Sequence, residues 1–264
     1  MQAHFDAQQR QRSKLTELGL GLSIDIVAAL ATSAVVAPFV AIIDRSIISN
    51  ASGRMPLMAG LQDGFRTLAT RPAVLARQPS VVAVFSVYAI TYITANASET
   101  IALSANADPL LPKFLASSTV NIAACVYKDK LLTHWCSLGP ARPFPMASYG
   151  LFGLRDSLTV AASFSLPPLL STMLQSNTSM SKTSCDSISQ LALPCMVQFI
   201  STPIHLLGLD IYNNPSATAV RRAQVVRRDF IPSTLARMGR ILPAFGFGGL
   251  VNNKTRTTLK RWIL

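Results

Sequence analysis

Long stretches of apolar residues, separated by shorter segments rich in polar and basic residues, run through most of the chain. A helix needs about 20 mainly apolar residues to cross the hydrocarbon core of a bilayer. Four stretches reach that length, and they are residues 19–43, 80–98, 157–181 and 187–209. The first is interrupted only by Asp25, and the other three contain no Asp, Glu, Lys or Arg. The pattern therefore predicts four helices that span a membrane.

Two further apolar segments, residues 114–127 and 241–253, are too short to span a bilayer on their own. They reach spanning length only if flanking polar residues join the helix and face a cavity or a neighbouring helix. We therefore predict an all-α membrane protein with six tilted transmembrane helices in residues 19–253, between a polar N-terminal tail (1–18) and a basic C-terminal tail (254–264). A soluble bundle of buried helices is the alternative interpretation.

The composition supports a membrane protein. Half of the 264 residues are hydrophobic and only 14% are charged, which excludes a disordered chain and is unusual for a soluble domain. The 24 Lys and Arg residues outnumber the 12 Asp and Glu residues, which gives a net charge of +12. Nucleic-acid binding would require a water-facing surface rich in charge, and long stretches of the chain have none. We instead expect basic pairs such as Arg221/Arg222 and Arg227/Arg228 to contact anionic membrane lipids.

No pattern typical of an enzyme or a metal site is present in the sequence. Cys125, Cys136, Cys185 and Cys195 form no CxxC pair, and His4, His134 and His205 are far apart. The chain also lacks the serine elbow of hydrolases and the phosphate-binding glycine loop. We therefore expect no catalytic residues, no metal and no cofactor.

The first and last thirds of the chain share a layout. The segment PAVLAR at residues 72–77 matches PSTLAR at residues 232–237. Each copy follows an apolar span that contains a proline, then an acidic residue and a basic loop; these are Pro38 and Asp44 in the first third, and Pro203 and Asp210 in the last. The middle third contains a partial counterpart, YGLFGLRD at residues 149–156. The layout predicts three helix-loop-helix repeats.

With these repeats the chain resembles the mitochondrial carrier family. The resemblance is carried by Gly64, Phe65, Arg66, Pro72, Arg77, Pro79, Phe85, Tyr88, Arg155, Asp156, Phe230, Pro232, Arg237, Arg240, Pro243 and Phe247. More narrowly, residues 201–210 and 235–243 resemble a group of fungal carrier-like proteins without assigned function. The resemblance implies both chain ends on one side, a multi-pass location in a mitochondrial membrane (inner rather than outer), and solute transport through a central cavity.

The site residues also follow from the resemblance. It implies that Arg77, Arg155, Arg237 and Arg240 point into the central cavity and bind an anionic metabolite, because guanidinium groups suit carboxylate and phosphate. Interfacial arginines that contact lipid phosphate are the alternative. Asp25 lies inside the first span, where a charge is costly, so it either faces the cavity or is paired at the interface. His205 follows Pro203 and is either a protonatable gate residue or a packing residue.

One departure from the carrier pattern concerns the gate. Carriers end each odd helix with a proline, an acid two residues later and a base three residues after that. Val40 and Ile43 occupy those places after Pro38, and His205 and Gly208 occupy them after Pro203. The gate charges would then be displaced to Asp44, Arg45, Lys128, Asp129, Lys130 and Asp210. This departure favours the alternative of a non-transporting membrane factor for protein insertion, lipid movement or organelle organisation.

Overall fold

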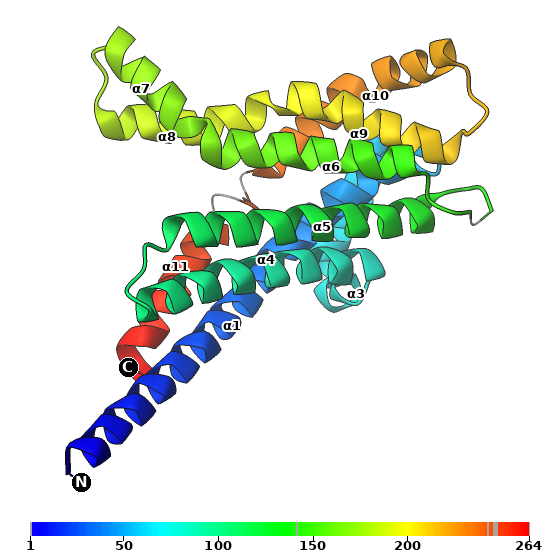
Figure 1. Cartoon of the computed structure of the whole chain (residues 1–264). Helices are drawn as coiled ribbons and strands as arrows, with labels where there is room; N and C mark the ends of the chain where they lie inside the picture. The colour runs from blue at the N-terminus through cyan, green and yellow to red at the C-terminus, as the bar shows by residue number, and fades with distance from the viewer. Residues whose placement is uncertain (1, 141, 242, 245–247, 264) are drawn as a thin grey trace.

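The computed structural model describes residues 2–140, 142–241, 243–244 and 248–263, and every regular element in this part of the chain is a helix (Figure 1). The helices are α1 (Gln2–Ala51), α2 (Leu57–Thr70), α3 (Pro72–Ala76), α4 (Pro79–Ser104), α5 (Leu110–Cys136), α6 (Met146–Val160), the π-helix η1 (Ala161–Ser165), α7 (Pro167–Asn177), α8 (Lys182–Met196), α9 (Gln198–Asn213), α10 (Ala219–Gly239) and α11 (Gly248–Ile263). Phe247, one of the residues behind the carrier resemblance, lies outside the described residues.

Four helical segments are long and apolar enough to cross a membrane. They are Leu15–Ala51, Pro79–Ser104, Leu110–Cys136 and Lys182–Asn213. A fifth span results if Met146–Ser163 and Pro167–Asn177, which are bent by 41° relative to each other, count as one broken helix. The prediction of an all-α, multi-pass membrane protein is therefore confirmed.

The two weaker spans have different outcomes. The segment 114–127 lies within α5, which reaches spanning length by including Lys113, Lys128 and Asp129, as expected. The segment 241–253 falls partly outside the described residues, and within the described part neither α10 nor α11 is long and apolar enough to span. The six-helix architecture with three repeats is therefore not confirmed.

The exposure pattern of α1 shows which surface faces lipid. Its buried positions recur with the helical period and include the polar residues Asp25, Thr32 and Ser33. Apolar residues occupy the exposed face between them, namely Ile26, Val27, Leu30, Val35 and Phe39. A continuous apolar outer face beside buried polar side chains is unusual for a helix of a soluble bundle. The outer face of this helix therefore fits a hydrocarbon environment.

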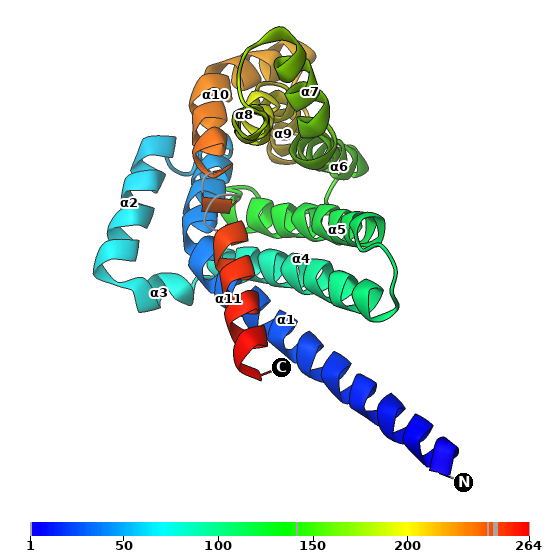
Figure 2. The same ribbon diagram turned by 90° about the vertical axis from the view of Figure 1, so that its left-hand side faces the viewer.

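The helices form two layers. In Figure 1, α6 to α10 lie above α1, α4, α5 and α11. Helix α1 packs on α4 and α11, α5 lies between α4 and α6, and α9 contacts both α6 and α10. Helix α10 also contacts α1, so the packing closes on itself. Figure 2 shows α2 and α3 beside the other helices.

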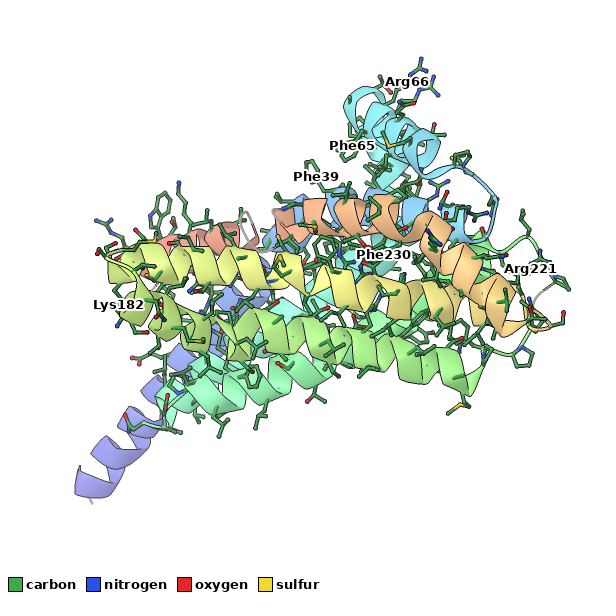
Figure 3. All side chains as sticks on the ribbon, turned by 90° about the horizontal axis from the view of Figure 1, so that it is seen from above. Phe39, Phe65, Arg66, Lys182, Arg221 and Phe230 are labelled. Atoms are coloured by element: carbon green, nitrogen blue, oxygen red, sulfur yellow. The ribbon has the colours of Figure 1, made fainter. Side chains whose placement is uncertain are left out.

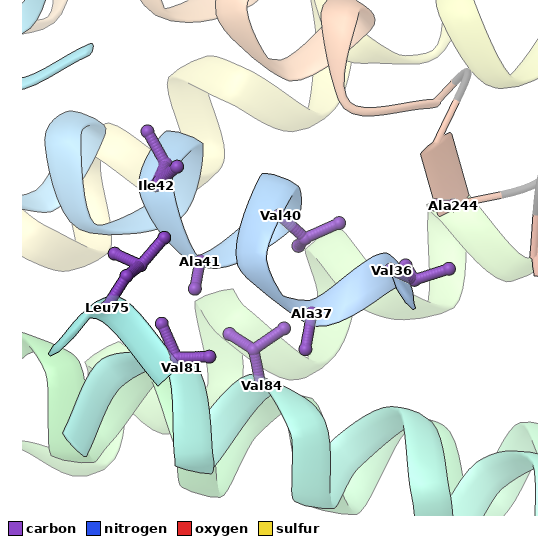
Figure 4. Packing of buried hydrophobic residues seen from close by; sticks show 9 residues of the cluster. All are labelled: Val36, Ala37, Val40, Ala41, Ile42, Leu75, Val81, Val84 and Ala244. Carbon is purple, nitrogen blue, oxygen red and sulfur yellow. The ribbon is translucent and has the colours of Figure 1, made fainter. Parts of the chain in front are cut away.

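We name the two ends of the bundle by the chain segments they carry. The loop side carries residues 51–79, 136–146 and 213–219, and the terminal side carries residues 104–110, 177–182 and the C-terminal end of α11. One apolar cluster lies where α1 crosses α4. Figure 4 shows Ala37 and Ala41 of α1 facing Val84 and Val81 of α4. Small side chains on α1 permit this close approach.

Candidate functional site

Buried charges join four helices near the loop side. Asp44 of α1 forms salt bridges with Lys128 of α5 and with Arg240 at the end of α10. Lys128 Nζ also lies 2.8 Å from the Asp129 carboxylate. Arg155 of α6 contacts Asp129 and Asp156, each at 2.6 Å. We call these six residues (Asp44, Lys128, Asp129, Arg155, Asp156 and Arg240) the loop-side ion cluster.

The loop-side ion cluster is buried, so its charges depend on one another. Five of its side chains are nearly inaccessible, and that of Arg240 is only 18% exposed. Removing one partner of a buried pair leaves an uncompensated charge, which costs about 3–5 kcal/mol. His205 of α9 is attached to the cluster, because its Nδ1 lies 2.7 Å from Arg155 Nη1. The cluster therefore holds α1, α5, α6, α9 and α10 together.

Three predicted site residues lie apart from the loop-side ion cluster. Arg45 points away from Asp44, and its Nη1 donates a hydrogen bond of 2.6 Å to Gln78 Oε1. Arg77 is exposed at the C-terminal cap of α3, so the expectation that it points into a central cavity is corrected. Asp210 pairs with Arg222 at 2.6 Å, near the loop-side end of α9.

A second group of buried charges lies towards the terminal side. Asp25 is fully buried and lies 2.7 Å from Arg256 Nε of α11. Arg256 Nη1 contacts Glu99 of α4 at 2.9 Å, and Glu99 contacts Lys113 of α5 at 2.8 Å. We call Asp25, Glu99, Lys113 and Arg256 the terminal-side ion cluster. At 1.5 Å per residue, the 19 positions from Asp25 to Asp44 correspond to roughly 28 Å along α1, close to the thickness of the hydrocarbon core.

Polar residues also line the contact between α9 and α10. Arg237 of α10 is only 1% exposed. Its Nε donates to Gln198 Oε1 at 2.9 Å, and its Nη2 donates to Ser201 Oγ at 3.2 Å. Within the described residues, no carboxylate lies within 4.0 Å of this guanidinium group. Arg237 is thus a buried cation whose protein partners are neutral.

Three hydroxyl groups on the same two helices have no hydrogen-bond partner in the described part of the chain. They belong to Thr202 of α9 and to Ser233 and Thr234 of α10, and all three residues are buried. Buried polar groups are nearly always satisfied, so such orphans point to a missing partner. We call Gln198, Ser201, Thr202, Ser233, Thr234 and Arg237 the polar seam.

The polar seam lies beside a break in a spanning helix. Helix α8 ends at Met196 and α9 begins at Gln198, halfway along the span Lys182–Asn213. Pro194 lacks a backbone N–H, and its carbonyl accepts a hydrogen bond of 2.9 Å from Gln198 Nε2. A second break follows α6, where the π-helix η1 precedes α7. Transporters commonly bind substrate near the bilayer midplane, at helices interrupted in this way.

The sequence therefore predicts part of the candidate site. The structure places five predicted residues in the loop-side ion cluster, namely Asp44, Lys128, Asp129, Arg155 and Arg240, and attaches a sixth, His205, to it. It places Arg237 in the polar seam and Asp25 in the terminal-side ion cluster. Glu99, Lys113 and Arg256 were missed, although a membrane-embedded Asp25 required a cationic partner. Gln198 and the orphan hydroxyls were missed because Ser, Thr and Gln are common in packed helices.

Comparison with known proteins identifies the family. No curated protein matches the chain. The profile of a family described as "Probable citrulline exporter" matches residues 28–260, which include most of the first spanning segment, Leu15–Ala51, and all of the others. The resemblance to mitochondrial carriers was therefore wrong, which agrees with the absence of carrier spacing around Pro38 and Pro203. The description indicates a membrane protein of the transporter type, and the chain belongs to the probable citrulline exporter family.

Proposed function

We propose that the protein exports citrulline, or a neutral amino acid of similar structure, across its membrane, and that the polar seam binds this substrate on its way. The family description supports the substrate class. The observation that carries the proposal is Arg237, a buried guanidinium group without a carboxylate partner among the described residues. An ionisable group inside a membrane domain marks a functional site by default.

The chemistry of citrulline fits the seam. The molecule carries an α-carboxylate, an α-ammonium group and an uncharged ureido group. A guanidinium group binds a carboxylate with two parallel hydrogen bonds, so Arg237 would bind the α-carboxylate. The orphan hydroxyls of Thr202, Ser233 and Thr234 can each donate and accept, which suits the ammonium and ureido groups.

A net anionic substrate, which the carrier resemblance implied, fits this arrangement less well. Arg155 and Arg240 are already paired with carboxylates in the loop-side ion cluster. Arg77 is exposed at the end of α3. Of the four arginines expected to bind substrate, only Arg237 offers a buried positive charge without a carboxylate partner in the described part. The single positive charge of Arg237 matches the single carboxylate of a zwitterionic amino acid.

Transport would require the seam to open to one side at a time. The loop-side ion cluster ties α1, α5, α6 and α10, and the terminal-side ion cluster ties α1, α4, α5 and α11. Separation of one cluster while the other stays closed would give access from one side. The break at Val197 and the π-helix η1 supply positions where α8 and α6 could bend.

The proposal is tested by transport in reconstituted vesicles. Purified protein is inserted into liposomes loaded with unlabelled citrulline, and accumulation of external labelled citrulline is followed. We expect exchange that unlabelled glutamine inhibits more strongly than ornithine or aspartate, because only glutamine shares the neutral carbonyl-amide end. Protein that catalyses no citrulline exchange above empty liposomes would contradict the proposal.

We further propose that anionic lipids surround this exporter, that it is not an enzyme and that it resides in a mitochondrial membrane. Arg221, Arg227 and Arg228 are exposed on α10, and basic side chains near an anionic surface contribute about 1 kcal/mol each. Cell fractionation with protease protection tests the location. Recovery of the protein outside the mitochondrial fraction would contradict it.

A further inference from the structure

A cavity at the loop side is separate from the polar seam. It has a volume of about 390 Å³ and lies between α1, α2, the start of α4 and the end of α5. Small-molecule sites start at about 300 Å³, so this cavity is large enough for an amino acid. Its apolar wall includes Ile42, Leu75, Val81 and Leu132. None of its lining residues belongs to the polar seam or to either ion cluster.

The cavity also contains charged side chains of both signs. Arg45 and Arg54 line it, and no carboxylate lies within 4.0 Å of either guanidinium group in the described part of the chain. Asp63 of α2 lines it too, and its carboxylate has no basic side chain within that distance among the described residues. Two cations and one anion without ion-pair partners are therefore gathered around one small volume.

Neutral contacts hold the two arginines in place. Arg45 Nη1 donates to Gln78 Oε1 at 2.6 Å, and Arg54 Nη1 donates to the backbone oxygen of Trp135 at 2.7 Å. Each guanidinium group carries five N–H donors, so others are available for a ligand. A planar donor fork that is already oriented loses less entropy when it binds a carboxylate.

Close packing between α1 and α2 fixes the opposite wall. A Cβ atom added to Gly64 would lie 2.5 Å from Ile42 Cγ2, and one added to Gly60 would lie 2.9 Å from Ser46 Oγ. Only glycine allows this approach of α2 to α1 at both positions. The two glycines flank Asp63 on the same helix, so they set the distance of its carboxylate from Arg45.

We propose that this cavity is a second amino-acid site, at the loop-side surface of the exporter. Arg45 and Arg54 bind the α-carboxylate, Asp63 binds the α-ammonium group, and the side chain lies along the apolar wall. The ligand class rests on the proposed function, because the ligand is the exported amino acid. The site would hold substrate at the membrane surface, before it enters the polar seam or after it leaves.

The test is the stoichiometry of labelled citrulline bound to full-length protein in detergent, measured by equilibrium dialysis. We expect two sites per chain in the wild type. D63N and R45Q should each weaken one site on the order of tenfold, which corresponds to about 1.4 kcal/mol. R237Q should remove the other site. R66Q is the matched control, because Arg66 is exposed on α2 and lies away from the other helices (Figure 3).

The outcomes separate this inference from the proposed function. A single site that R237Q removes and D63N and R45Q leave unchanged would overturn the cavity proposal and keep the seam. A single site that D63N and R45Q weaken and that R237Q leaves unchanged would keep the cavity proposal and overturn the polar seam as a binding site. No binding in the wild type would contradict both.

A second measurement separates recognition from stability. A carboxylate that lacks the α-amino group should bind the D63N protein as well as it binds the wild type. If D63N weakens this ligand as much as it weakens citrulline, Asp63 acts on the fold and not on the ammonium group, and the proposal fails.

Discussion

Asp44 and Arg240 are 196 positions apart in the sequence, yet Arg240 Nη1 donates a hydrogen bond of 2.5 Å to Asp44 Oδ1. The same carboxylate forms a salt bridge with Lys128 of α5. One acidic residue therefore connects the first spanning helix to α5 and to the end of α10. This connection holds the three helices together near the loop side.

Asp44→Asn should strongly destabilise the protein. The substitution removes the negative charge from two buried cations, and breaking a buried pair costs about 3–5 kcal/mol. We expect a clear drop in the melting temperature in detergent. Asp108→Asn is the control, because Asp108 is exposed and asparagine can still accept the hydrogen bond from the Leu110 backbone N–H. Equal melting temperatures for the two variants would show that the loop-side ion cluster contributes little.

Gln198→Glu should lower transport. Arg237 would gain a carboxylate partner at the position of Gln198 Oε1, where it now has a neutral one at 2.9 Å. The substitution also removes the N–H that Gln198 donates to the Pro194 carbonyl, and a buried ion pair often gives no net gain, so we expect no increase in the melting temperature. The new carboxylate would compete with the substrate for the guanidinium group. Gln198→Glu protein that transports citrulline at the wild-type rate would argue against Arg237 as the carboxylate site.

Arg256→Gln should destabilise the terminal side. Asp25 would lose the only cation within 4.0 Å of it in the described residues, and Glu99 would retain Lys113 alone. We expect a loss of about 3–5 kcal/mol, read as a lower melting temperature. Lys254→Gln removes the same charge from an exposed position on α11 and should have no measurable effect. Equal effects of the two substitutions would indicate a general dependence on charge.

Gly208→Ala should weaken the packing of α6 on α9. A Cβ atom at this position would lie 2.7 Å from Cε1 of Phe152, which is fully buried. Overpacking of this kind costs about 1–3 kcal/mol. Gly153→Ala on α6 meets nothing within 4 Å and should stabilise its helix by up to about 1 kcal/mol. A neutral result at Gly208 would mean that Phe152 can move aside.

The spanning segments were predictable because hydropathy is a local property of the sequence. Residues 19–43, 80–98 and 187–209 all fall within spanning helices of the structure. The inclusion of polar residues at the ends of α5 also followed from length, since the 14 residues between Lys113 and Lys128 are too few to cross a bilayer alone. The helix around 157–181 differed because η1 and Pro167 interrupt it.

The contacts within the site were less predictable because they join distant parts of the chain. The position of Asp25 inside a span indicated that it needs a cationic partner. The sequence did not indicate that this partner is Arg256, which lies in the segment expected to be a basic tail. Arg45 is adjacent to Asp44 in the sequence, but successive residues of a helix point in different directions. Arg45 therefore lines the loop-side cavity, while Asp44 belongs to the loop-side ion cluster. Arg77 matched Arg237 in its repeat segment, yet it ends a short helix at the surface. A shared motif thus did not imply a shared environment.

Citrulline exchange by Arg237→Gln protein, compared with wild type and Arg237→Lys in the same liposomes, tests the central claim most directly. We expect Arg237→Gln to lose exchange and Arg237→Lys to retain part of it, because lysine keeps the charge without the bidentate fork. Melting temperatures measured in parallel confirm that the variants are folded. Wild-type exchange by folded Arg237→Gln protein would contradict the proposal that the polar seam is the transport site.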